Sequence, residues 1–321
     1  MVGNLITLLV LIALGVLFAW LTKRAWGSRH KVLKWPALVL SGLLTLLLAL
    51  ITVVGGKGLI QLYKPYTPAP AQVSVAGTPE QVARGEHLAV VLCASCHAPD
   101  GKLPLRGGNN MSADAGLPLG DLYPPNITPA GKIKNLTDSD IMRILRTGIA
   151  PDGRFTFMAT VNARHLSDED AQSVIAYLRH TPTVQEQPPD TNFSMLLALF
   201  VGSGIVSPDV PTTIQPVPAV AKAVTREYGE YVVNIMDCRS CHGPTLTGDA
   251  PPPLPKSPNL KFIVPNWSKE DFIMAMRTGV DRNGHHIQPP MPWQTIGRLE
   301  DVELAAAYEY LHNLPAVEAQ K

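Results

Sequence analysis

The chain has 321 residues, of which 30 are proline, about twice the usual share of roughly 5%, and this frequency predicts many linkers and irregular loops. Its formal net charge at pH 7 is +1, but no acidic residue precedes Glu80, and residues 80–321 carry 20 basic and 26 acidic side chains, a net charge of −6. A nucleic-acid-binding protein would have the opposite balance in its folded part, so the composition excludes that class.

Two uncharged apolar runs, 2–22 and 36–56, open the chain. Each has about 20 residues, the length that crosses ~30 Å of hydrocarbon as a helix. A cleaved signal peptide is the alternative for the first run, but that run lacks a charged start and a clear small-residue cleavage site. We therefore expect a transmembrane hairpin over residues 1–61.

The loop between the runs, KRAWGSRHKVLKW, contains five basic residues and no acidic one. Short basic loops stay in the cytoplasm, so everything after residue 57 is expected on the outer face of the membrane. In a bacterium that is the periplasmic face of the inner membrane. Trp20, Trp26 and Trp35 lie near the expected interface, as an aromatic belt does.

Compact regions are expected over 79–182 and 226–316, after a Pro- and Ala-rich tether (62–78) that should be extended and semi-rigid. A Pro-rich linker, 183–225, joins them and contains the apolar run FSMLLALFVGSGIV (193–206). Its 14 residues are too few to span a membrane. We expect this run to pack at an interface with the membrane or a partner; burial between the two compact regions is the alternative.

The two compact regions form an internal repeat. GEHLAVVLCASCH matches GEYVVNIMDCRSCH with one inserted residue, and LTDSDIMRILRTGIAPDGR matches WSKEDFIMAMRTGVDRNGH without a gap. Each repeat is predicted to contain three helices, the first of which covers about 80–92 in repeat one and ends at the cysteine motif. The middle helix has a capping-box start and a terminal glycine, at Thr137, Asp140 and Gly148 in repeat one and at Ser268, Asp271 and Gly279 in repeat two. The third begins near Ser167, with Asp170 three residues later.

All four cysteines lie in two Cys-x-x-Cys-His motifs at matching places in the repeat. A redox dithiol would need a thioredoxin-like βαβ setting, a structural zinc site would need four closed ligands, and disulfides across two-residue gaps would be strained. A histidine directly after the second cysteine is typical of c-type haem attachment, in which the histidine also ligates the iron. We therefore predict two covalently bound haem c groups, held by Cys93, Cys96 and His97 and by Cys238, Cys241 and His242.

A low-spin electron-transfer haem needs a second axial ligand. In repeat one the candidates are Met111, Met142, Met158 and His165. Met142 falls inside the middle helix and is expected in the core, and Met111 lies in a Gly- and Asn-rich loop. Met158 follows a DGR turn before the third helix, as Met291 follows an NGH turn, so we predict that Met158 is the ligand.

In repeat two the sequence PPMPW places Met291 at the equivalent position, and Met291 is the predicted ligand there. Met274 and Met276 fall on the middle helix and are expected in the core. His285 and His286 are rival ligands, but a surface position or a contact with a haem propionate is the simpler interpretation.

These motifs resemble the class I cytochrome c fold and, more closely, the multihaem cytochrome c subunits of membrane-bound alcohol and gluconate dehydrogenases. The similar stretches are ARGEHLAVVLCASCHAPDG, NITPAGKIKNLTDSDIMRILRTGIAPDGR and LSDEDAQSVIAYLRHTP in repeat one, and 226–315 in repeat two. The resemblance implies a mainly α fold, with the transmembrane hairpin followed by two tandem class I cytochrome c domains, and haems ligated by His and Met. It also matches Arg146–Gly148 and Arg277–Gly279 to the end of the family's middle helix, and Asn126 and Asn259 to its loop asparagine.

The chain departs from that family, which usually has three haem domains and no N-terminal hairpin. A hairpin with two haems is similar to the haem-bearing third subunit of one class of terminal oxidases, but the acidic, Trp-rich linker expected of that subunit is missing.

The leading hypothesis is a membrane-anchored dihaem electron carrier in a respiratory or photosynthetic complex, which relays electrons from a quinol-level donor to a downstream carrier or oxidase. The acidic outer part favours docking to a small soluble carrier with a basic patch, although an ordinary acidic surface would look the same. No separate catalytic residue is predicted. Alternatives are a dihaem peroxidase-type enzyme with a labile distal ligand in repeat one, and a gas-binding sensor.

Overall fold

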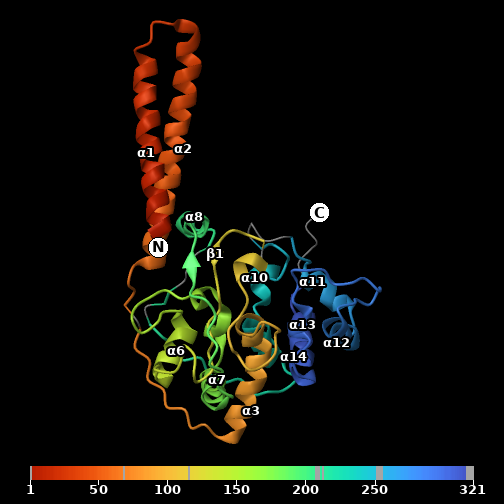
Figure 1. Cartoon of the computed structure of the whole chain (residues 1–321). Coiled ribbons are helices and arrows are strands. Elements are labelled where there is room, and N and C mark those ends of the chain that lie inside the picture. Colours follow the sequence, from red (N-terminus) through yellow and green to blue (C-terminus); the bar gives the residue numbers. More distant parts are fainter. Residues whose placement is uncertain are drawn as a thin grey trace. The chain divides into compact units, whose positions relative to one another are not determined.

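Helices form nearly all of the regular structure in this computed structural model, which describes residues 2–67, 69–114, 116–206, 210–211, 213–250 and 256–315 (Figure 1). The predicted mainly α class is confirmed. Residues 1, 68, 115, 207–209, 212, 251–255 and 316, which the predicted regions include, lie outside the described residues. The chain divides into two compact units: Met1–Tyr66 with Asn110–Tyr123 and Pro189–Pro208, and Thr67–Asn109 with Pro124–Pro188 and Asp209–Lys321.

The first unit is built on a helical hairpin, α1 (Val2–Trp26) and α2 (Lys31–Tyr63), whose two helices pack side by side (Figure 1). Both are long and apolar enough to cross a membrane. Apolar side chains such as Leu46 and Val53 are 69% and 70% exposed, which favours a lipid surrounding. Helix α2 begins five residues before the predicted run 36–56 and ends seven residues after it.

The short helix α8 (Met195–Ser203) packs against α2 within this unit. A Cβ atom added to Gly58 would lie 1.7 Å from the Ala198 carbonyl oxygen, and one added to Gly202 would lie 1.9 Å from that of Val54. Glycine at both positions therefore permits the backbones to touch. The apolar run 193–206 finds its packing partner in the hairpin, and its predicted contact with membrane or partner stays a prediction.

Two short strands, β1 (Gly120–Asp121) and β2 (Asn192–Phe193), pair antiparallel in the same unit, which also contains α5 (Met111–Asp114). Asn4 Nδ2 of α1 donates a hydrogen bond to the Phe193 carbonyl oxygen at 2.7 Å. The start of the hairpin is thereby tied to the strand that leads into α8.

The second unit contains repeat two and all of repeat one except Asn110–Tyr123, which belongs to the first unit. The helices of repeat one are α3 (Pro79–Leu88), the π-helical turn η1 (Ala89–Cys93), α4 (Ala94–His97), α6 (Asp138–Thr147), the 3₁₀ turns η2 (Phe157–Thr160) and η3 (Asn162–His165), and α7 (Asp168–His180). Those of repeat two are α9 (Arg226–Ile235), α10 (Cys238–His242), α11 (Leu260–Ile263), η4 (Val264–Asn266), α12 (Lys269–Thr278), α13 (Trp293–Ile296) and α14 (Asp301–His312). The buried apolar side chains of the two repeats form one continuous cluster.

The first and third helices of each repeat cross at a glycine. A Cβ atom on Gly85 of α3 would lie 1.8 Å from the Ser173 carbonyl oxygen of α7, and one on Gly229 of α9 would lie 1.9 Å from the Ala306 carbonyl oxygen of α14. The contact between α3 and α7 is thus repeated between α9 and α14, which bears out the internal repeat at the level of backbone packing.

The middle helices begin and end as predicted. Capping boxes are formed by Thr137 with Asp140 and by Ser268 with Asp271. The terminal glycines are left-handed, with φ of 67° at Gly148 and 71° at Gly279, in a region that favours glycine.

One of the three methionines predicted to lie in the core does not. Met142 and Met276 are buried, as expected, but Met274 is 59% exposed, so its assignment to the core was wrong. On a helix that buries one face, residues two apart point in different directions, and Met276 takes the inward position.

Candidate haem-attachment sites

Each cysteine motif lies on a helical turn at the end of the first helix of its repeat. In repeat one the helix continues from α3 through η1 into α4, so Cys93 and Cys96 lie one turn apart. In repeat two the chain breaks between α9 and α10 at Asp237, whose φ is 57°, before Cys238 and Cys241. The residue inserted in repeat two is therefore taken up next to the motif, and both repeats still present the two sulfurs on a helical turn.

The four thiols are half-buried and none is in a disulfide. Burial raises the pKa of Cys93 and of Cys238 to about 12, and the adjacent Cys96 and Asp237 respectively add to the effect. Reactive dithiols have lowered pKa values instead. The motifs therefore do not have the properties of a redox dithiol.

The motif histidines are buried and oriented by backbone carbonyls. His97, 8% exposed, donates from Nδ1 to the Pro125 carbonyl oxygen at 2.9 Å, and His242, 5% exposed, donates to that of Pro258 at 3.0 Å. Burial lowers the pKa of both imidazoles, and the carbonyl contact only partly offsets it. Each ring is therefore neutral at pH 7 with its lone pair on Nε2, the form that ligates iron.

The loop asparagine after each proline was noted from the sequence, but the proline was not. Asn126 is fully buried, donates from Nδ2 to the carbonyl oxygens of Val184 and Glu186 at 2.7 and 2.8 Å, and accepts from the Thr128 amide at Oδ1. These bonds fix the turn that presents the Pro125 carbonyl. The Pro–Asn pair shared by both repeats, 125–126 and 258–259, is the signal that would have found the histidine partners.

The predicted distal ligands occupy equivalent loops. Met158, at the second residue of η2, and Met291, before α13, are both half-buried against the apolar core. A Cβ atom on Gly148 would lie 2.1 Å from the Ala159 nitrogen, and one on Gly279 would lie 2.4 Å from the Trp293 ring. Each methionine is thus held in a loop that returns onto the glycine ending the middle helix.

The other candidate iron ligands of repeat one do not lie in the loop that contains Met158. Met111 belongs to the first unit, and Met142 is 5% exposed inside α6. His165 lines a cavity of about 380 Å³ beside Asp237 and Arg239 of repeat two. In repeat two, the His285 side chain is 78% exposed and pairs with Asp281 at 3.2 Å, in keeping with a surface position.

The arginine in each matched Arg-Thr-Gly segment ties the middle helix to the third. Buried Arg146 donates to the Arg164 and Leu166 carbonyl oxygens and pairs with Asp168 at 2.5 Å. Arg277 donates to the Gly297 carbonyl oxygen and pairs with Asp301 at 2.7 Å. These contacts position the loop that contains each candidate methionine.

The donor set of each repeat fits a haem c group. Two thiols on one helical turn match its two thioether bonds, and a neutral imidazole fixed through Nδ1 offers Nε2 to iron. A half-buried thioether in an equivalent loop of each repeat, Met158 or Met291, could serve as a second iron ligand.

Comparisons with known proteins agree with this arrangement. The family model described as Cytochrome c matches residues 82–182 and 227–315, more than half of the chain. A nicotinate dehydrogenase subunit of Pseudomonas putida is 31% identical over 167 residues, which cover 47% of this chain and 13% of that protein. The cytochrome c subunit of the quinone alcohol dehydrogenase of Gluconobacter oxydans is 30% identical over 105 residues, which cover 29% and 22%.

The gluconate 2-dehydrogenase cytochrome c subunit of Pantoea cypripedii is 30% identical over 107 residues, 29% of this chain and 24% of that protein. The chain thus spans less than a quarter of the length of these relatives. Because the family match covers both repeats and each contains a complete Cys-x-x-Cys-His motif, the chain belongs to the cytochrome c family, whose domains imply covalently bound haem c.

Proposed function

We propose that the protein is a membrane-anchored dihaem cytochrome c that transfers electrons on the outer face of a bacterial inner membrane. The observation that carries the proposal is the pair of buried motif histidines, each held by a proline carbonyl beside two half-buried thiols, at equivalent places in two repeats. When bound, the haem groups supply reversible one-electron chemistry at iron.

In this proposal Cys93 and Cys96 hold one haem and Cys238 and Cys241 hold the other. His97 and Met158 would ligate the iron of the first haem, and His242 and Met291 that of the second. A neutral thioether favours the reduced state relative to a second imidazole. The apolar cluster packs against a cysteine and the methionine of each site, and such a low-dielectric surrounding would strengthen this preference.

Two observations support the membrane placement. The hairpin has two helices of sufficient length and apolar character, and the loop joining them contains five basic residues and no acidic one. By the positive-inside tendency the loop faces the cytoplasm and both repeats face the periplasm.

The partners follow from the relatives and from charge. The relatives named above are dehydrogenase subunits, two of them cytochrome c subunits, and we propose that this chain likewise receives electrons within a multi-subunit complex, from a donor at the quinol level. Residues 80–321 carry a net charge of −6, which supports docking of a small soluble carrier through a basic surface.

The test is reduction of the detergent-purified full chain by a soluble quinol analogue, followed by reoxidation with a small basic cytochrome. The proposal predicts that both haems are reduced and reoxidised, that the oxidised protein has the red charge-transfer band of methionine–iron ligation, and that the reduced protein does not bind CO. Rapid CO binding with hydrogen peroxide turnover would contradict it and would favour the peroxidase-type alternative.

A further inference from the structure

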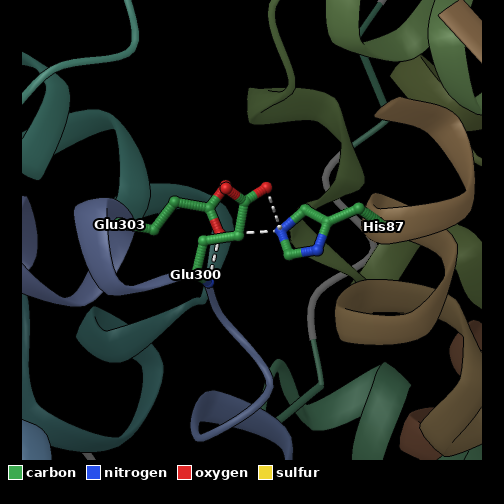
Figure 2. A group of neighbouring side chains, drawn as sticks. All are labelled: His87, Glu300 and Glu303. Carbon is green, nitrogen blue, oxygen red and sulfur yellow. Dashed lines mark hydrogen bonds and ion pairs between the residues drawn. The ribbon is translucent and has the colours of Figure 1, made fainter. Parts of the chain in front are cut away.

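A cluster of charged and hydrogen-bonding side chains lies where the two repeats meet, inside the second unit. We name it the interdomain cluster; its members are Arg84 and His87 of α3, Asp170 of α7, Tyr228 and Tyr231 of α9, and Glu303 of α14. Figure 2 shows His87 from repeat one facing Glu300 and Glu303 from repeat two. Sequence patterns predicted neither these partners nor a contact between the repeats.

One guanidinium joins a carboxylate from each repeat. Arg84 donates from Nε and Nη2 to the two oxygens of Asp170 at 2.8 and 2.9 Å, and from Nη1 to Glu303 Oε1 at 2.7 Å. The side chains of Arg84 and Glu303 are 20% and 1% exposed. Because the guanidinium is planar and three of its nitrogens donate, these bonds fix the orientation of both carboxylates as well as their distance from Arg84.

The remaining contacts are reciprocal. The His87 ring, from Nε2, contacts Glu303 Oε2 at 2.7 Å, and the Tyr231 hydroxyl donates to Asp170 Oδ2 at 2.5 Å. His87 and Tyr231 both lie two residues after the glycine at the helix crossing, and Asp170 and Glu303 are both the third residue of the third helix. The first helix of each repeat therefore reaches the third helix of the other.

The cluster is charged and its charges are paired. Burial alone would raise the pKa of Glu303, but the hydrogen bonds from His87 and Arg84 outweigh burial and lower it to about 2. The buried carboxylate is thus ionised at pH 7. Removal of its partner would leave an unpaired buried charge, which proteins tolerate poorly.

His87, Glu300 and Glu303 also bring ligand atoms within 4.8 Å of one another, as a metal site would (Figure 2). However, Lys222 Nζ lies 2.6 Å from Glu300 Oε1, and Arg84 Nη1 occupies Glu303 Oε1. Lysine and arginine already supply the positive charge that a metal ion would bring, so an ion-pair network accounts for the cluster.

The cluster lies close to both attachment motifs along the chain, through continuous helix in repeat one and across the break at Asp237 in repeat two. His87 precedes Cys93 by six residues, about 9 Å at 1.5 Å per residue, and Tyr231 precedes Cys238 by seven. Nearby, α13 contacts η1, η3 contacts α9, and Arg298 Nη1 donates to the Gly101 carbonyl oxygen at 2.6 Å. The segments beside the candidate methionines thus also touch the other repeat.

We propose that the interdomain cluster is a positioning device, in which Arg84 and its partners fix the two attachment helices relative to each other and thereby set the rate of electron transfer between the two haems. The proposal rests on the proposed function, because it needs a haem in each repeat. Electron transfer slows steeply as the gap between redox centres widens, so a loosened interface lowers the rate without altering either iron centre.

The test is flash photoreduction of the purified full chain, with the rate of electron equilibration between the haems as the readout. Arg84→Gln should lower this rate roughly tenfold. Arg84→Lys keeps the positive charge but not the planar set of three N–H donors, so its rate should lie between those of Arg84→Gln and the wild type. The matched control is Arg179→Gln, because Arg179 pairs with Asp138 at 2.8 Å within repeat one. This control should keep the wild-type rate.

Two further measurements make the outcome decisive. Haem content is assayed in every variant: a wild-type chain with fewer than two haems would defeat the proposed function, whereas two haems and an unchanged rate in Arg84→Gln would overturn only the positioning role. If Arg84→Gln does not fold, the milder double variant His87→Gln/Tyr231→Phe takes its place. A reduction of roughly threefold there supports the proposal, and a wild-type rate overturns it.

Discussion

The two repeats are alike where they form their attachment sites and different where they face each other. Both pair the motif histidine with a proline carbonyl and both cross their outer helices at a glycine. At the facing positions, repeat one has Arg84 and His87 where repeat two has Tyr228 and Tyr231. The duplication thus preserves the local site, whereas divergence turns two copies of one surface into complementary surfaces.

The carboxylates at the interface make the same point. Asp170 and Glu303 are equivalent acids, and two unmodified copies would have placed like charges near each other. The guanidinium of Arg84, present in repeat one alone, pairs with both acids. A single basic residue therefore makes the contact between the repeats favourable and asymmetric.

The largest expected effect tests the likeness of the two attachment sites. Cys93→Ala/Cys96→Ala and Cys238→Ala/Cys241→Ala should each remove one haem and leave the other, because each motif forms its own thioether pair. The pyridine haemochrome assay should give half the wild-type haem per polypeptide in both variants. Ser95→Ala, at an exposed position inside the first motif, is the control and should keep the full amount.

A result in which one double variant loses all haem, or none, would break the symmetry. It would mean that the two motifs are not independent sites of the same kind.

The helix crossings should be equally sensitive in the two repeats. Gly85→Ala and Gly229→Ala would each place a methyl group less than 2 Å from a carbonyl oxygen of the facing helix, and we expect a loss of about 3–4 kcal/mol in the free energy of unfolding. Thermal unfolding of the purified chain measures the change. Gly56→Ala, where an added Cβ atom meets nothing within 4 Å, should leave it unaltered.

Protonation of Glu303 at low pH should weaken the contact between the two repeats. Since the pKa of this carboxyl is lowered from 4.5 to about 2 in the folded chain, its contribution to stability is complete above pH 4.5 and is lost as the pH falls toward 2. Glu303→Gln should remove about 3 kcal/mol of stability at pH 7 and flatten the acid limb of the unfolding curve. The exposed Glu270→Gln is the control; if it changes the curve as much, the effect is not specific to the interface.

The smallest effect concerns the caps of the middle helices. Thr137→Ala and Ser268→Ala each remove a side chain that accepts from the backbone at N3, and each should lower the free energy of unfolding by about 1 kcal/mol. Chemical denaturation measures the two losses and the double variant, whose loss should be the sum. If the two decreases in the free energy of unfolding differ, the two middle helices are not stabilised alike by their caps.

The local features of this fold were predictable from the sequence. The apolar runs of the hairpin and both middle-helix capping boxes are visible in short stretches of sequence. The duplication is visible when the two repeats are aligned. The Cys-x-x-Cys-His motifs are equally local.

The long-range contacts were not predictable. Ser167 caps α7 as expected, but the carboxylate of Asp170 turns to Arg84 and Tyr231, and the Ser167 amide donates to the Tyr231 hydroxyl instead. In repeat two the N-cap is Glu300, a residue type outside the usual set. Partners from another repeat override a local pattern, and nothing in the spacing of one helix identifies them.

The same limit applies to α8 and to the histidine partners. The apolar run 193–206 was recognisable, but its partner depends on Gly58 of α2, more than 130 residues away in the chain. Likewise the carbonyls of Pro125 and Pro258 are backbone acceptors, which any residue type provides, so only comparison of the two repeats could single them out.

The central claim is that each repeat holds a haem through covalent bonds to its two cysteines. Mass spectrometry of the intact chain under denaturing conditions tests this most directly, because noncovalent groups are lost on unfolding. The account predicts a single species at the mass of the polypeptide plus two haem groups. A mass equal to the polypeptide alone, or to the polypeptide plus one haem, would contradict it.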